Sequence, residues 1–290
     1  MSNLIPKGLY GEEYAEDVAF VLKPKKVISS VTSKYQTSTL IETETFGRVL
    51  FQDNLIYIAD KGNESIYELY IHVPMQSGAP KKKVLLIGAG DGFGIKRILD
   101  YKSVEKLVAI DIDADFVKMA DEFFPESKHY KSDPRVEFLT VDGAEYVKNT
   151  KEKFDFVLVT VGDPFTVSHT MFNSEFVKNV SSILNPDGIF AIDGFMPYYT
   201  HEDVLNYWDI FKLVADEFAK TKISTSTTPI MPGGLVSFVF GSKTIDVANG
   251  GRNDLPVKTY WYTPEIHKSC FVLPQFMIDK LRDVKGFDQK

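Results

Sequence analysis

The sequence contains a single cysteine, Cys270, among its 290 residues. One thiol excludes an intrachain disulfide, argues against a cysteine-based metal site and favours a reducing compartment. No segment approaches the roughly 18 uncharged apolar residues of a membrane-spanning helix, and the N-terminus lacks the basic and apolar regions of a signal peptide. These absences predict a soluble, cytoplasmic protein without a membrane partner.

Positive charge is also scarce, because 33 Lys and Arg residues face 40 Asp and Glu residues, for a formal net charge of −7. Nucleic-acid binding requires surplus cations to displace phosphate counterions, so this balance argues against a nucleic-acid partner. An acidic protein suits a small cationic substrate, since negative clefts concentrate cations. The five histidines show no metal-ligand spacing, so no metal is expected.

Residues 1–75 have the pattern of a small strand domain. Between 27 and 60, segments rich in Val, Ile and Thr are separated by turn residues, and 63–73 has helical spacing. A polar break with Gly and Pro follows at 76–83. We therefore predict an N-terminal β-strand domain over 1–75 and a second, nucleoside-binding catalytic domain over 76–290.

The second part alternates between apolar strands and amphipathic helices, which indicates an α/β fold with a mostly parallel sheet covered on both faces. The expected strands cover 84–90, 106–113, 136–142, 154–161, 188–195 and 233–243. The expected helices cover 94–101, 113–124, 174–184 and 204–219.

A glycine-rich loop follows the first of these strands, with Gly88, Gly90 and Gly92 leading into a helix. Glycine permits a tight turn and lets the backbone approach a ligand closely. By itself the loop is also compatible with an ordinary strand-to-helix turn.

Acidic residues at the tips of the next two strands make the pattern more specific. Asp111 could accept hydrogen bonds from both ribose hydroxyls, and Asp142 could accept one from an adenine amino group. NAD-type dehydrogenases share the loop and the first acidic tip. However, Asp91 inside the loop would repel a pyrophosphate, whereas it suits the cationic amino end of an S-adenosyl ligand. The sequence therefore predicts a nucleoside site rather than a dinucleotide site.

Further segments extend the pattern over nearly the whole chain. They are SKYQ (33–36), FGRVLFQD (46–53), IHVP (71–74), GAGDG (88–92), SDPRVEF (132–138), DGAEYV (142–147) and YWYTPEIHKSCFVLPQF (260–276). Together they resemble the spermidine synthase (polyamine aminopropyltransferase) family. The last segment discriminates best, because a generic methyltransferase has no reason to carry it.

The resemblance implies a small N-terminal β-domain and a Rossmann-like core of the class I methyltransferase type, assembled as a homodimer or homotetramer. It implies transfer of an aminopropyl group from decarboxylated S-adenosylmethionine to a small-molecule amine, with release of methylthioadenosine. On this basis the donor site comprises Gln36, Gly88, Gly90, Asp91, Gly92, Asp111, Asp142 and Gly143.

The acceptor half departs from the family pattern. Thr160 stands where the family has the aspartate that accepts the amine's proton, and a threonine hydroxyl cannot take a proton near neutral pH. Ile66 and Met231 stand where channel tyrosines are usual, and Tyr67 stands at a Gln or His position. We therefore expect an acceptor other than plain putrescine.

Asp193 and Asp163 are candidates for the missing base or for an anchor of a cationic acceptor, and Glu68 has a different expected role. Asp193 occupies a strand tip where the family usually has Gln or Glu, and its alternative is an ordinary solvated carboxylate. Asp163 falls on the family's gatekeeping loop over the site. Glu68 is expected to form a wall of the amine pocket.

Two other functions remain open. The same pocket could use S-adenosylmethionine itself, in a methyl or aminocarboxypropyl transferase or in an enzyme that cleaves this molecule. Alternatively, with Thr160 at the base position, the chain could be a catalytically silent homologue that acts as a binding subunit.

Overall fold

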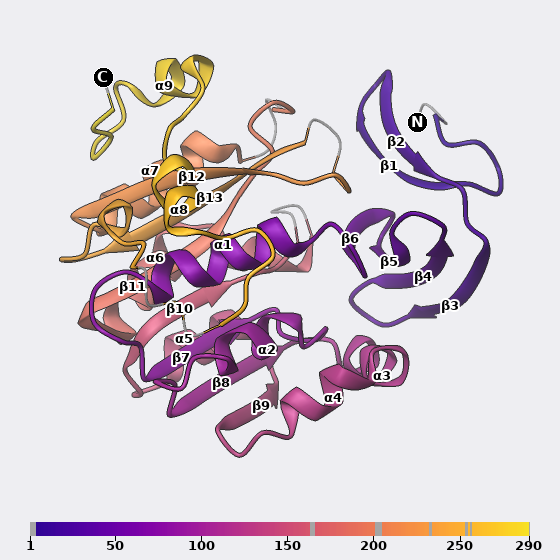
Figure 1. The fold of residues 1–290 in the computed structure, drawn as a ribbon, viewed down its shortest axis with the longest axis horizontal. Helices are drawn as coiled ribbons and strands as arrows, with labels where there is room; N and C mark the ends of the chain where they lie inside the picture. The colour runs from indigo at the N-terminus through magenta and orange to yellow at the C-terminus, as the bar shows by residue number, and fades with distance from the viewer. Residues whose placement is uncertain are drawn as a thin grey trace.

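Two small antiparallel sheets precede one seven-stranded sheet that has helices on both faces (Figure 1). The computed structural model describes residues 4–162, 166–200, 205–231, 234–252, 255 and 257–289. The N-terminal strands are β1 (Tyr10–Ala15), β2 (Val18–Leu22), β3 (Lys26–Thr32), β4 (Thr37–Thr43), β5 (Gly47–Gln52) and β6 (Leu55–Ala59). They form a β1-β2 hairpin and a four-stranded sheet of order β3-β4-β5-β6.

The strands of the large sheet are β7 (Lys83–Ile87), β8 (Lys106–Asp111), β9 (Val136–Thr140), β10 (Phe154–Val159), β11 (Leu184–Phe195), β12 (Lys220–Thr227) and β13 (Leu235–Ser242). Their order is β12-β13-β11-β10-β7-β8-β9, and every pairing from β11 to β9 is parallel. The predicted α/β class with a mostly parallel sheet is therefore confirmed. The strand order reverses at β7, and ligands of such sheets bind beyond the carboxyl ends of the strands at this reversal.

The α-helices are α1 (Glu64–Met75), α2 (Phe93–Leu99), α3 (Ala114–Phe123), α4 (Pro125–Lys131), α5 (Gly143–Asn149), α6 (Ser174–Ile183), α7 (Tyr207–Glu217), α8 (Pro264–Ser269) and α9 (Gln275–Leu281). Short 3₁₀ helices are η1 (Val167–Met171) and η2 (Val247–Asn249). Among the described residues, no helix combines the length and the apolar character needed to cross a membrane.

Alternate side chains of the parallel strands enter two separate cores, because successive residues of a strand point to opposite faces. In β7, Leu86 packs with α1 and α2 on one face, whereas Leu85 and Ile87 pack with α6 and α7 on the other. The sheet is thus buried on both sides, which explains the near-continuous apolar runs of its central strands.

The predicted helix over 204–219 is shorter in the structure, where α7 covers Tyr207–Glu217. Its start is fixed at Asn206, whose backbone N–H donates to the Asp209 carboxylate at 3.0 Å. The chain then turns directly into β12 at Lys220, so no residues remain for a longer helix.

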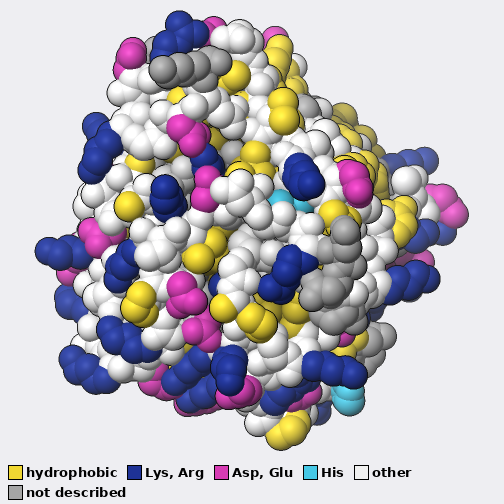
Figure 2. Space-filling model, turned by 60° about the vertical axis from the view of Figure 1, so that its left-hand side comes forward, with side chains coloured by type: hydrophobic (Ala, Val, Ile, Leu, Met, Phe, Trp, Pro, Cys, Tyr) yellow, Lys and Arg dark blue, Asp and Glu magenta, His cyan; other side chains and the backbone are white. Residues whose placement is uncertain are grey.

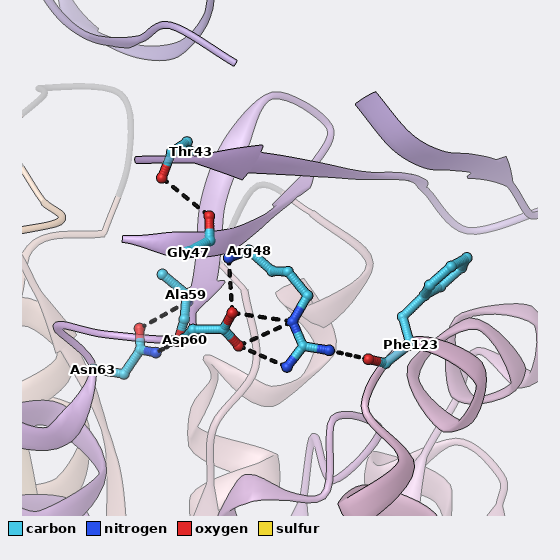
Figure 3. A network of polar contacts seen from close by, with 7 residues as sticks. All are labelled: Thr43, Gly47, Arg48, Ala59, Asp60, Asn63 and Phe123. Carbon is cyan, nitrogen blue, oxygen red and sulfur yellow. Dashed lines mark hydrogen bonds and ion pairs between the residues drawn. The ribbon is translucent and has the colours of Figure 1, made fainter. Parts of the chain in front are cut away.

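A polar network ties the N-terminal sheet to the large domain (Figure 3). Arg48 on β5 donates from Nε and Nη2 to the Asp60 carboxylate at 2.8–3.1 Å, and from Nη1 to the Phe123 carbonyl at the end of α3. Just before α1, the Asn63 amide pairs with both backbone groups of Ala59. These contacts link the N-terminal sheet to the end of α3 and to the start of α1.

Candidate active site

A cavity lies at that carboxyl edge, bounded by the tips of the parallel strands, by α1 and by the N-terminal sheets. Ten of the predicted site residues line it, namely Gln36, Ile66, Tyr67, Gly88, Asp111, Asp142, Gly143, Thr160, Asp193 and Met231. Gly90, Asp91, Gly92 and Glu68 do not line it. Asp163 lies outside the described residues.

The glycine loop is as tight as the sequence suggested. Gly88 has φ +88°, and a Cβ there would lie 2.1 Å from the carbonyl oxygen of Thr160. Gly92 has φ +77° and is the N-cap residue of α2. Gly90 donates its N–H to the Asp111 carboxylate at 2.7 Å. Side chains larger than hydrogen would therefore push the loop out of its position beside the cavity.

Asp111, at the tip of β8, is held by backbone donors. Its Oδ2 accepts from Gly90 N–H and its Oδ1 accepts from Asp113 N–H at 3.0 Å. Burial raises the pKa of Asp111 to about 6 despite these two bonds. The carboxylate is thus fixed at the cavity wall and incompletely solvated, which suits an acceptor for ligand hydroxyls.

Two further polar side chains reach the cavity from either side of Asp111. Asp142 is the N-cap of α5, and its Oδ1 accepts from the N–H groups of Ala144 and Glu145 at 2.8 and 3.1 Å. Gln36, between β3 and β4, donates from Nε2 to Asp113 at 3.1 Å. The structure therefore brings together the strand-tip residues predicted for a nucleoside.

Asp91 is buried behind the cavity wall, with 2% of its surface exposed. Its Oδ2 accepts from the hydroxyl of Tyr67 at 2.9 Å and from that of Tyr57 at 3.2 Å, and its Oδ1 accepts from Phe93 N–H at 2.6 Å. Both tyrosines line the cavity. The predicted carboxylate is thus present, but two phenols stand between it and the ligand space.

Asp193 lies at the other end of the cavity, near the tip of β11. Burial raises the pKa of Asp193 to about 6, while the neighbouring Tyr70 phenol and the N–H of Phe195 oppose the rise. Phe195 has φ +60°, and its N–H lies 2.6 Å from Asp193 Oδ1. A non-glycine residue in this region stores about 1–3 kcal/mol of strain, which is common where a functional group must be aimed.

Thr160 does not offer a free hydroxyl in this arrangement. Its Oγ1 donates to the Gly88 carbonyl at 3.0 Å, so it joins the tips of β10 and β7. Ile66 and Met231 present apolar surface to the cavity at the positions where the sequence suggested altered channel residues. The cavity is therefore apolar at these two positions.

Glu68 points away from the cavity, into the segment that precedes α8. Its carboxylate accepts the backbone N–H groups of Tyr260, Trp261 and Tyr262 at 2.7–3.2 Å. The side chain is 5% exposed. Its observed position is that of an anchor for the C-terminal segment.

The sequence reasoning missed several lining residues, above all Tyr57, Tyr70 and Glu12. One signal was available for Tyr70, because Asn63, Ile66, Tyr67 and Tyr70 share one helix face at i, i+3, i+4 and i+7. Glu68 lies off this stripe. Tyr57 comes from β6 and Glu12 from β1, and only tertiary packing brings these strands to the cavity.

The cavity is acidic inside. Five carboxylates line it and, among the described lining residues, there is no Lys, Arg or His. The outer surface differs, since Figure 2 shows acidic and basic side chains interspersed on the face it displays. In the described part of the chain, no group of three or more His, Cys, Asp or Glu is placed to hold a metal ion.

Comparison with known proteins identifies relatives along the whole chain. The family model described as "Spermine/spermidine synthase domain" matches residues 64–249. A polyamine aminopropyltransferase of Thermoanaerobacter sp. (strain X514) is 34% identical over 276 residues, covering 95% of this chain and 99% of the relative. That of Bacillus subtilis (strain 168) is 30% identical over 274 residues, covering 94% and 98%.

Solved structures agree with this assignment. A crystal structure of a spermidine synthase in complex with the transition state analogue AdoDATO has a TM-score of 0.89 at 27% identity, covering 97% of this chain and 99% of that one. The spermidine synthase from Thermotoga maritima has a TM-score of 0.88 at 28% identity, with 94% of each chain covered. Family model, relatives and fold coincide, and the chain belongs to the spermine/spermidine synthase family.

Proposed function

We propose that this protein is a transferase that moves the aminopropyl group of decarboxylated S-adenosylmethionine to an amine other than plain putrescine. The observation that carries the proposal is the shared cavity, in which the nucleoside-type carboxylates Asp111 and Asp142 face the same space as Asp193. A cationic donor and a cationic acceptor both suit a space whose described lining contains carboxylates but no Lys, Arg or His. The relatives bear the name of this activity.

In the proposed reaction, the lone pair of the acceptor amine attacks the propyl carbon that is bonded to the sulfonium sulfur. A C–N bond forms as the C–S bond breaks, and the bonding electrons stay on sulfur, so neutral methylthioadenosine leaves. The protein's main contribution is to hold the two reactants in line. The amine must lose one proton, because an alkylammonium with a pKa near the ~10.4 of lysine has no free lone pair.

Asp193 is the proposed recipient of that proton among the described residues. Its raised pKa of about 6 makes it a stronger base than an exposed aspartate. Thr160 cannot replace it, since a hydroxyl is a poor base and this one donates to Gly88. Asp163 is the second proposed candidate for this base, and it lies outside the residues that the structure describes.

The altered acceptor is supported by the apolar lining. Ile66, Met231, Met196 and Phe238 all border the cavity. Methylene groups gain about 0.8 kcal/mol each when they are buried against such surface. An amine with a longer or bulkier apolar part than putrescine is therefore favoured.

The test is a turnover assay with decarboxylated S-adenosylmethionine and a panel of putrescine, cadaverine, agmatine and spermidine. We expect methylthioadenosine release, with at least one larger amine preferred over putrescine, and about a 100-fold or greater loss of rate in Asp193→Asn. A preference for putrescine would overturn the acceptor assignment. Absence of methylthioadenosine with every amine would overturn the activity.

The same assay separates the alternatives. S-adenosylmethionine in place of its decarboxylated form would yield S-adenosylhomocysteine if the protein were a methyltransferase. A silent binding subunit would bind the donor in calorimetry without turnover, and Thr160→Asp would be the variant to restore activity. Size-exclusion chromatography with light scattering would test the proposed homodimer or homotetramer, and fractionation the proposed cytoplasmic location.

A further inference from the structure

Three tyrosines, Tyr57, Tyr67 and Tyr70, form one wall of the cavity between Asp91 and Asp193. We call them the tyrosine wall. The hydroxyls of Tyr57 and Tyr67 donate to Asp91, and Tyr70 lies beside Asp193. The tyrosine wall therefore extends from Asp91 to Asp193.

The hydrogen-bonding capacity of Asp91 is largely used within the protein. It accepts from Tyr57, Tyr67 and the N–H of Phe93, and almost none of its surface is exposed. These bonds oppose the rise that burial causes in the pKa of Asp91, so they hold its negative charge in place. A ligand in the cavity meets the phenols before it meets the carboxylate.

The two phenols are held in fixed orientations. Tyr57 packs edge-on against Phe116 with ring centroids 5.8 Å apart, and the Arg97 guanidinium lies 5.3 Å from the ring centroid of Tyr67. Burial and the neighbouring Asp91 charge raise the pKa of both phenols well above the ordinary value, so both stay protonated. Because each O–H is directed at Asp91, each oxygen is left to act toward the cavity only as an acceptor.

We propose that the hydroxyl oxygens of Tyr57 and Tyr67, rather than the carboxylate of Asp91, receive the primary ammonium at the end of the donor's propyl chain. An ammonium has three donors and no acceptor, so two neighbouring phenol oxygens match it. The negative charge of Asp91 behind them polarises each O–H and strengthens its oxygen as an acceptor. This assignment rests on the proposed function, and it makes both tyrosines determinants of donor specificity.

Calorimetry with two sulfonium nucleosides tests the assignment. One is decarboxylated S-adenosylmethionine, and the other carries a second methyl group on sulfur in place of the aminopropyl chain. Their affinity ratio isolates the chain and its ammonium, because both share the nucleoside and the positive sulfur. In the wild type we expect the aminopropyl compound to bind more tightly. In Tyr57→Phe/Tyr67→Phe we expect this preference to fall about tenfold or more, with the methyl compound bound within about threefold of wild type.

The two single variants carry the test if the double variant does not fold, each with an expected loss of at least about threefold in the ratio. Tyr130→Phe on α4, which does not line the cavity, is the matched control and should leave the ratio unchanged. An unchanged or increased ratio in the cavity variants would show direct contact with Asp91 and overturn the inference. Failure of the wild type to bind either nucleoside would instead overturn the proposed function.

Discussion

Replacement of Asp193 by asparagine should stabilise the protein in a pH-dependent way. Burial raises the pKa of Asp193 from 3.8 to about 6, and each pKa unit corresponds to about 1.36 kcal/mol. The charged form of Asp193 therefore destabilises the folded state by up to about 3 kcal/mol. Because part of the side chain faces the cavity, where solvent screens the charge, we expect about 2 to 3 kcal/mol.

The sign follows from linkage. Below pH 3.8 the group is protonated in both states and the cost is absent, whereas above pH 6 it is charged in both states and the cost is complete. Stability of the wild type relative to Asp193→Asn is thus lost as pH rises through this window. Between pH 4.5 and 7.5 the stability gain of the variant should grow by about 2 kcal/mol.

Urea unfolding of both proteins at the two pH values measures this gain, and the difference between them cancels other titrating groups. Asp283→Asn, at an exposed position near the C-terminus, serves as the control and should change stability by less than about 0.5 kcal/mol at both pH values. An equal gain for Asp193→Asn at pH 4.5 and 7.5 would refute the reasoning.

Three other substitutions probe the site and its supports. Gly88 has φ +88°, and Gly88→Ala would place a methyl group 2.1 Å from the carbonyl oxygen of Thr160. The free energy of unfolding in urea should therefore fall by about 3 kcal/mol or more. A stable variant that still binds the donor would contradict the tight loop. Thr160→Val removes one hydrogen bond to Gly88 and should lower the free energy of unfolding by about 1 kcal/mol. Turnover should stay within a few-fold of wild type, whereas abolished turnover would indicate that Thr160 is catalytic. Glu68→Ala removes the hydrogen-bond acceptor of the N–H groups of residues 260–262, so the free energy of unfolding should fall by about 3 kcal/mol or more. Donor affinity in calorimetry should not change, which would not be expected if Glu68 formed a wall of the amine pocket.

The sequence predicted the parallel core because its strands carry strong apolar signals. Several other elements were not predicted, and α4 and β12 show why. Helix α4, PESKHYK, has no apolar stripe at helical spacing, so no periodicity marks it. Strand β12, KTKISTST, alternates in burial, yet Thr221, Ser224 and Ser226 occupy buried positions. Because the buried residues are Ser and Thr, the segment has no hydrophobic pattern in the sequence. It can be identified as a strand only from its pairing with β13.

The convergence of the strand-tip residues on one cavity was predictable for a geometric reason. The carboxyl ends of parallel strands meet at one edge, so the loop at Gly88 and the carboxylates Asp111 and Asp142 had to converge. The phenols that cover Asp91 were not predictable in this way, since β6 and α1 reach the cavity through packing between separate sheets. That Glu68 points away from the cavity could have been predicted from the sequence, because this residue lies off the helix face that carries Ile66 and Tyr67.

Arg48 lies outside the cavity, yet it links the N-terminal sheet to the end of α3. Arg48 holds Asp60 with two guanidinium nitrogens and the end of α3 with the third, and lysine could satisfy only one of these partners well. Exchange of this arginine would therefore weaken the contact between β5 and the end of α3 while every side chain that lines the cavity stayed the same.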